Sequence, residues 1–170
     1  MKWAGAFFII LASFLIGQRK SKAYTNRVLH IRQFESALLT LQSAILFGAD
    51  SIETTARFIA ETIEKPAALF FRDFAEELSS TEMSAANVWT HTLQRHNEFF
   101  DLKQSDIRLI EQAGHMLGSC TQEAEERRIK HVLKQLEKRR EEAVAEEQRF
   151  ASMVRAISVL SGLLTAILLM

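Results

Sequence analysis

The sequence has few of the residues that interrupt helices or form tight turns. It contains one proline and six glycines among 170 residues, and no stretch sustains the period-two alternation of a half-buried strand. A β-sandwich or barrel would need many short strands joined by turns rich in proline and glycine. The scarcity therefore argues against a β protein and predicts an all-α chain.

Sequence motifs typical of nucleotide-binding, metal-binding or catalytic sites are also missing. The chain has no G-x-x-x-x-G-K loop for a nucleotide phosphate and no Glu-x-x-His pair of the kind that di-metal helical bundles use. Cys120 is the single cysteine, so no disulfide can form within the chain, and no histidine is placed to activate its thiol. Glu111 and His115 are four residues apart, the spacing of an ordinary surface pair on a helix. We expect no catalytic residue, no cofactor and no metal, and a protein that is not an enzyme.

Net charge is zero, but the charges are unevenly distributed. Residues 1–34 contain six basic residues and no acidic one, whereas the remainder contains 15 basic and 21 acidic residues. Basic residues beside an apolar run are typical of contact with anionic lipid headgroups. No recognition-helix or aromatic pattern accompanies them, so we expect no nucleic-acid partner. The membrane-face residues predicted from this cluster are Arg19, Lys20, Lys22 and Arg27.

Both ends of the chain are apolar. Residues 3–17 and 156–170 are free of charge, and each run of fifteen residues rises about 22 Å as a helix. That is short for a hydrocarbon core of about 30 Å, so local bilayer thinning or packing against partner helices must make up the difference. We predict transmembrane helices at residues 1–17 and 153–170, around a cytosolic helical bundle at 18–152. A cleaved secretory signal is the alternative for the first run.

The flanking charges predict the orientation. Four basic residues follow the first run, Arg149 and Arg155 flank the second, and only Lys2 lies on the other side. The positive-inside rule then places the central segment in the cytoplasm. Ser158 and Gly162 form a small-xxx-small pair in the second run, which could let another helix approach closely within the membrane.

Six helices are predicted from stripes and caps. Residues 27–47 carry apolar residues at spacings of three and four, and further stripes cover residues 52–63, 66–78, 84–96 and 105–117. The sixth helix begins near residue 121 and has no obligatory stop before residue 170. The predicted N-caps are Asp50 or Ser51, Ser84 and Ser105.

Together these helices predict a six-helix antiparallel bundle flanked by the two terminal transmembrane helices. Residues 18–47 and 122–155 would each rise about 45–50 Å from the membrane, and the four helices between them would be shorter. The end farthest from the membrane is the expected partner end. Its candidate residues are Phe47, Gly48, Ser119 and Gln122.

Aromatic and charged segments allow two interpretations each. Phe70, Phe71, Phe74 and Trp89 lie at helical spacing, which favours a core cluster over a ligand site. The charge runs at residues 125–128 and 138–142 are typical of a solvated helix face, although such a face could also contact a partner.

Several motifs in order carry a resemblance to a known family over nearly the full length. They are Gly5 with the run to Gly17, Tyr24, Phe34 to Leu41, Phe70-Phe71, Trp89, residues 102–106, Leu117-Gly118, Gly162-Leu163-Leu164 and residues 167–170. In this pattern the sequence resembles stage III sporulation protein AB of endospore-forming Bacilli and their relatives. It departs from the family at Ala44, at Cys120-Thr121 and at Glu125.

The resemblance implies a non-enzymatic structural or assembly component of the channel between mother cell and forespore. The cytosolic domain would be similar to the F-type platform proteins of type II secretion systems. Its implied partners are membrane lipids, a cytosolic secretion-type ATPase and other stage III sporulation channel proteins, with a homo-oligomer possible. The implied location is the cell membrane on the mother-cell side of the forespore. A membrane-anchored helical adaptor or receptor unrelated to secretion, or a membrane-anchored enzyme, is the competing interpretation.

Overall fold

The computed structural model describes the backbone of residues 2–47, 51–117 and 122–169, and side chains within residues 21–46, 51–117, 127–154 and 157. All regular elements in these ranges are helical, which confirms the predicted all-α class with six α-helices. The elements are α1 (Lys2–Phe47), α2 (Ile52–Thr62), α3 (Ala67–Ser80), α4 (Ala85–His96), the 3₁₀ helix η1 (Asn97–Phe99), α5 (Gln104–Gly114) and α6 (Gln122–Leu169).

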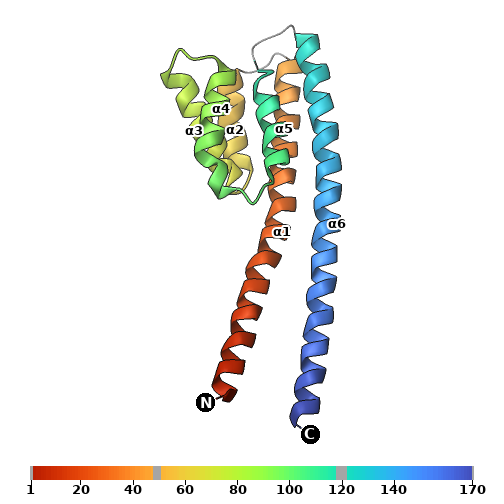
Figure 1. Ribbon diagram of the computed structural model, residues 1–170. Helices are drawn as coiled ribbons and strands as arrows, with labels where there is room; N and C mark the ends of the chain where they lie inside the picture. Colours follow the sequence, from red (N-terminus) through yellow and green to blue (C-terminus); the bar gives the residue numbers. More distant parts are fainter. Residues whose placement is uncertain (1, 48–50, 118–121, 170) are drawn as a thin grey trace.

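Two long helices set the shape of the molecule. α1 has 46 residues and α6 has 48, so each is about 70 Å long. They pack more extensively against each other than any other pair in the described part of the chain. Helices α2 to α5 cover only one end of this pair, and beyond them α1 and α6 continue in the same direction, so that both termini lie at the same end (Figure 1).

Successive helices run in opposite directions along the bundle (Figure 1). The turn between α3 and α4 lies at the end far from the termini, whereas the turns between α2 and α3 and between α4 and α5 lie at the near end. We call these the distal and proximal ends of the bundle.

Local sequence fixes where the short helices begin. Ser51 and Ser84 are N-caps whose hydroxyls accept the backbone N–H of Thr54 and Asn87, as predicted. The prediction of Ser105 as the cap of α5 is wrong. Lys103 occupies the N-cap position, and its backbone N–H donates to the carboxylate of Asp106, three residues later.

The core is rich in aromatic rings. Phe70, Phe71, Phe74 and Trp89 are fully buried, which confirms the predicted core cluster. Phe70 and Phe74 each meet the Trp89 indole edge to face, at centroid distances of 4.9 and 5.2 Å. Such pairs are preferred electrostatically and contribute about 0.5–1.5 kcal/mol beyond burial. Phe34 of α1 packs on Phe70 at 5.6 Å and joins the long helices to this core.

The two terminal transmembrane helices predicted at residues 1–17 and 153–170 are not supported. In the part of the chain that the structure describes, no helix is long and apolar enough to cross a membrane. The uncharged runs of about fifteen residues fall short of the roughly twenty apolar residues that a typical span needs.

Candidate functional site

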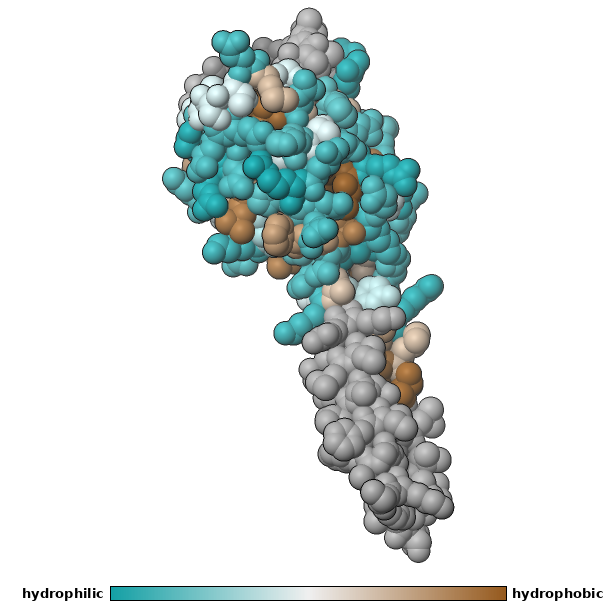
Figure 2. Space-filling model, turned by 60° about the vertical axis from the view of Figure 1, so that its left-hand side comes forward, coloured by the Kyte–Doolittle hydropathy of each residue, from teal (hydrophilic) through white to brown (hydrophobic). Residues whose placement is uncertain are grey.

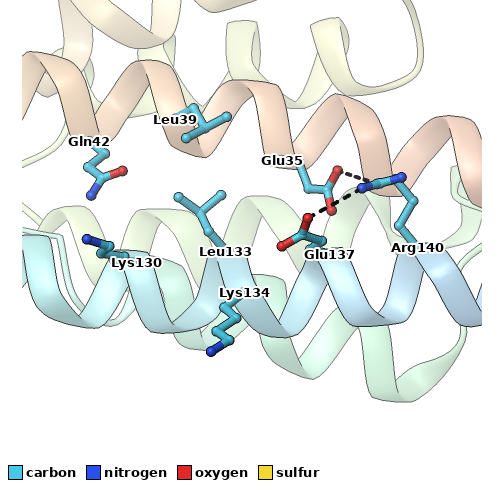
Figure 3. Close-up of a pocket in the computed structure, with 8 residues that line it drawn as sticks. All are labelled: Glu35, Leu39, Gln42, Lys130, Leu133, Lys134, Glu137 and Arg140. Carbon is cyan, nitrogen blue, oxygen red and sulfur yellow. Dashed lines mark hydrogen bonds and ion pairs between the residues drawn. The ribbon is translucent and has the colours of Figure 1, made fainter.

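A groove with a volume of about 640 Å³ lies between α1 and α6 (Figure 3). Its walls come from helices almost a hundred residues apart in the sequence. The lining residues are Glu35, Leu39 and Gln42 of α1, and Lys130, Leu133, Lys134, Glu137 and Arg140 of α6.

The middle of the groove is apolar. Leu39 and Leu133 come from opposite helices and face each other across it (Figure 3). The Leu39 side chain is 55% exposed, and Leu133 is only partly buried. Two leucines open to water at a helix–helix junction leave room for a further apolar side chain between them.

Ion pairs close the proximal end of the groove. Arg140 donates from Nε to Oε2 of Glu35 at 3.0 Å, and its Nη2 lies 3.9 Å from Oε1 of Glu137. Apolar residues recur on α6 at heptad-like spacing and form a seam that Arg140 and Glu147 interrupt: Ile129, Leu133, Leu136, Ala143 and Phe150. The contact of Arg140 across to α1 explains the first interruption. The other oxygen of Glu35, Oε1, is buried without a hydrogen-bond partner.

Burial raises the pKa of Glu35 above its ordinary value of 4.5, although the charge of Arg140 and the hydrogen bond from it lower this pKa in part. An acid whose pKa is raised on folding binds its proton more tightly in the folded than in the unfolded state. Stability from this group is therefore present below the unfolded pKa and is lost as pH rises through the folded pKa.

With Glu35→Gln, we expect the free energy of unfolding to fall less as pH rises from the ordinary glutamate pKa through the raised pKa of Glu35. Urea unfolding at a series of pH values measures this. Glu141→Gln, at an exposed residue of α6, is the control and should leave the slope unchanged. An identical slope for Glu35→Gln and the wild type would contradict the prediction.

The distal half of the groove is basic. Lys130 and Lys134 are exposed on α6, one helical turn apart, and no acidic side chain in the described ranges lies within ion-pair distance of either. Figure 3 shows Lys130 at the mouth of the groove and Lys134 on its outer side. The groove thus combines an apolar centre with an uncompensated positive rim.

A second polar cluster joins α1, α5 and α6 at the proximal end of the bundle. Arg27 of α1 donates from Nε and Nη2 to the two carboxylate oxygens of Asp106, at 2.8 and 3.1 Å, and from Nη1 to Glu146 at 2.9 Å. Lys103 also donates to Glu146, at 2.6 Å. Burial alone lowers the pKa of Arg27, but the hydrogen bond and charge of Asp106 outweigh it and raise the pKa.

Further contacts tie the same level of the bundle together. Thr25 donates its hydroxyl to Glu147 at 2.6 Å, and the rings of Tyr24 and Phe150 lie 4.8 Å apart. Glu147, the second interruption of the α6 seam, is therefore also explained by a contact with α1. We call the contacts of α1 and α6 at residues 24–27 and 146–150 the neck.

Three of the four predicted membrane-face residues lie on α1 beyond the neck, and the fourth lies within it. Arg19 and Lys20 lie on α1 beyond the bundle, with side chains outside the described set, and Lys22 is exposed. Arg27 departs from the prediction, because it is only 4% exposed and its guanidinium is occupied by two carboxylates. Its role is to join helices within the protein rather than to contact lipid.

The predicted partner-end residues lie at the edge of what the structure describes. Phe47 ends α1 and Gln122 begins α6, but neither side chain is described, and Gly48 and Ser119 fall outside the described residues. Ser158 and Gly162 lie on α6, also without described side chains. These predictions stay predictions.

The sequence of α1 contains a further apolar feature that bears on the groove. Besides its buried stripe, α1 has a second set of leucines at positions 29, 39 and 46, spaced by ten and seven residues and 41–55% exposed. Leu39 and Leu46, seven residues apart, lie on nearly the same helix face, and Leu29 is turned from them by about 80–100°. A helix with two apolar faces has one face left after the core is filled.

No group of three or more histidine, cysteine, aspartate or glutamate side chains that could hold a metal occurs among the described residues. The histidines instead make local contacts. His96 reaches Asp73 at 2.9 Å, His91 reaches Glu77 at 2.7 Å, and Nδ1 of His30 accepts the backbone N–H of Asp101. These contacts join neighbouring helices and η1 to the bundle.

Comparison with known proteins gives one consistent result. The family described as stage III sporulation protein AB matches residues 2–170. Stage III sporulation protein AB of Bacillus subtilis (strain 168) is 30% identical over 170 residues, covering 100% of this chain and 99% of the relative. A solved structure of stage III sporulation protein AB superposes with a TM-score of 0.71 at 27% identity, covering 73% of this chain and 98% of that one. The chain therefore belongs to the stage III sporulation protein AB family.

Proposed function

We propose that this protein is a membrane-anchored structural component of the channel that links mother cell and forespore, with no enzymatic activity of its own. The observation that carries the proposal is the continuity of α1 and α6. Each runs unbroken from the bundle core through the neck to an uncharged terminal run, and both runs lie at the same end of the molecule (Figure 1). Two apolar helix ends on the same side of a polar bundle are well suited to anchor that bundle at a bilayer.

The surface supports an anchor at this end. The bundle in Figure 2 is covered mainly by hydrophilic residues, with hydrophobic residues visible on the stalk below it. Beyond the neck, the exposed apolar residues of α6 are Met153, Val154 and Ile157. Arg19, Lys20 and Lys22 follow the first apolar run, where basic side chains would meet lipid headgroups. Bilayer thinning or partner helices would accommodate the short runs.

In this proposal the neck gives the protein its mechanical role. Ion pairs and ring contacts fasten α1 to α6 where they leave the bundle, so the two helices would move as one body. A cytosolic secretion-type ATPase acting on the distal end, as the family resemblance implies, could thereby transmit motion to the membrane. Other stage III sporulation channel proteins would meet the helices in the bilayer.

Cysteine labelling tests the anchoring and the orientation. In a Cys120→Ser background, Ser80→Cys places a thiol at an exposed distal position, and Met170→Cys places one after the second apolar run in the sequence. We expect a membrane-impermeant maleimide to label Met170→Cys in intact cells and Ser80→Cys only after permeabilisation. Labelling of Ser80→Cys from outside would overturn the cytoplasmic assignment. Recovery of the protein in the soluble fraction would overturn the anchor.

The partner assignment needs a separate measurement. Cross-linking of the full-length protein in membranes from sporulating cells should capture a secretion-type ATPase together with stage III sporulation channel proteins. Membranes from vegetative cells expressing the same protein are the control. A capture that contains neither kind of partner would leave the anchor intact but contradict the assembly role.

A further inference from the structure

An exposed aromatic residue stands on the outer face of α2. The side chain of Phe58 is 59% exposed, so a large apolar ring stands open to water. Glu61, one turn further along, is also exposed and has no ion-pair partner in the described ranges. The neighbouring Arg57 is held by Glu53 at 3.0 Å, four residues before it. The face therefore presents one apolar ring and one uncompensated negative charge.

This face complements the groove between α1 and α6. The groove offers an apolar centre at Leu39 and Leu133 and two uncompensated positive charges at Lys130 and Lys134. A helix that presents a ring flanked by a carboxylate meets both requirements, in the manner of an amphipathic helix lying in a groove. Opposite charges at the rim would fix the register of such a contact.

Both surfaces lie on helices that begin or end at the distal end of the bundle (Figure 1). Leu39 lies about 12 Å along α1 from the distal end of that helix, and Leu133 and Lys134 lie about 17 and 18 Å along α6 from its start. Phe58 is six residues into α2, about 9 Å from its start, and Glu61 is about 14 Å from it. On copies standing side by side on one membrane, a ring seated between the two leucines would place the carboxylate about 5 Å nearer the membrane, within reach of Lys134.

We propose that the groove between α1 and α6 binds the outer face of α2 from a second copy of this chain. Phe58 of one protomer inserts between Leu39 and Leu133 of the next, and Glu61 pairs with Lys130 or Lys134. The ring and the groove are different patches on each protomer. Each copy can therefore use both patches at once, in a head-to-tail contact of the kind that builds a ring when the rotation between copies closes. The alignment of the two surfaces in neighbouring copies rests on the proposed membrane anchor. Their chemical complementarity does not.

Disulfide cross-linking of the full-length protein in membranes tests the contact. In a Cys120→Ser background, one tagged copy carries Phe58→Cys and a differently tagged copy carries Leu39→Cys. A disulfide forms only where two Cα atoms come within about 7 Å, so mild oxidation should give a heterodimer. Phe99→Cys is the matched control, since Phe99 is also an exposed phenylalanine, at 66%, but lies in η1 at the proximal end. It should give only background cross-linking with Leu39→Cys.

A charge swap provides a second measurement. Lys130→Glu together with Lys134→Glu on the Leu39→Cys copy should lower the heterodimer yield about fivefold, as expected for loss of an ion pair at a partly exposed rim. Glu61→Lys on the Phe58→Cys copy should restore it. Equal yields from the Phe58 and Phe99 pairs would overturn the proposal. Preferred Leu39-to-Leu39 linkage, or linkage of Leu39→Cys only to a different protein, would also overturn it. Fractionation of the same cells into membrane and soluble protein reports separately whether the anchor holds.

Discussion

Arg27→Met is expected to lower the free energy of unfolding by about 3–5 kcal/mol, the cost of leaving a buried charge without its partner. Asp106 is completely buried, and Arg27 supplies two of its hydrogen bonds. Without the guanidinium, the carboxylate would keep only neutral donors such as the backbone N–H of Lys103. Glu146 would lose its contact with α1 at the same time, so that the neck would keep the Thr25–Glu147 hydrogen bond and ring packing but lose the ion pair between α1 and α6.

Urea unfolding of the full-length protein, followed by the fluorescence of Trp89 in a Trp3→Phe background, measures the loss. Arg57→Met is the matched control, because the Arg57–Glu53 pair is half exposed and should cost less than about 1 kcal/mol. The double variant Arg27→Met/Asp106→Leu should recover much of the stability, since an apolar pair can replace a buried ion pair. Similar losses of unfolding free energy for Arg27→Met and Arg57→Met would show that the buried Arg27–Asp106 pair stabilises the fold no more than an exposed ion pair does.

Most of the fold could be predicted because it depends on local signals. Ser51 and Ser84 mark helix starts, and the buried stripe on α1 follows directly from residue spacing. The fully buried rings of α3 and α4 likewise follow from their positions on one helix face. Such features need only a few neighbouring residues to be read, and the scarcity of proline and glycine left few alternatives to helix.

Contacts between distant helices could not be predicted in the same way. Arg27 belongs by sequence to a basic cluster next to an apolar run, and only the fold brings Asp106, 79 residues away, against it. Arg140 and Glu147 break the apolar seam of α6 for the same reason, because each meets a polar partner on α1. A sequence pattern shows that a charge interrupts a seam, but the partner that compensates it depends on which helix faces it.

The groove shows a related limit. The exposed leucines of α1 and the lysines of α6 are visible in the sequence, but the hollow exists only because the two long helices pack side by side over the bundle. A surface made by two elements has no single stretch of sequence that encodes it. The second leucine set on α1 indicated an unfilled face without indicating its neighbour.

Gly114→Ala is expected to destabilise the protein by about 3 kcal/mol, at the upper end of the usual cost of overpacking a core. A methyl group at this position would overlap Cδ1 and Cγ of Trp89, whose ring is fully buried among the phenylalanines of α3. The indole is also fixed by its hydrogen bond from Nε1 to the carbonyl oxygen of Ile110, at 3.0 Å. The ring therefore has no free direction in which to move.

The sign of the effect separates this explanation from helix propensity. Alanine is a better helix former than glycine by about 1 kcal/mol, so Gly114→Ala would stabilise α5 if the space were open. Urea unfolding decides between the two, with Gln112→Ala on the exposed face of the same helix as the control, expected within about 0.5 kcal/mol of wild type. Trp89→Phe frees space beside Gly114, so the double variant should lose less stability than the sum of the single losses. If the two losses in unfolding free energy simply add, the close approach of α4 and α5 does not depend on having glycine at residue 114.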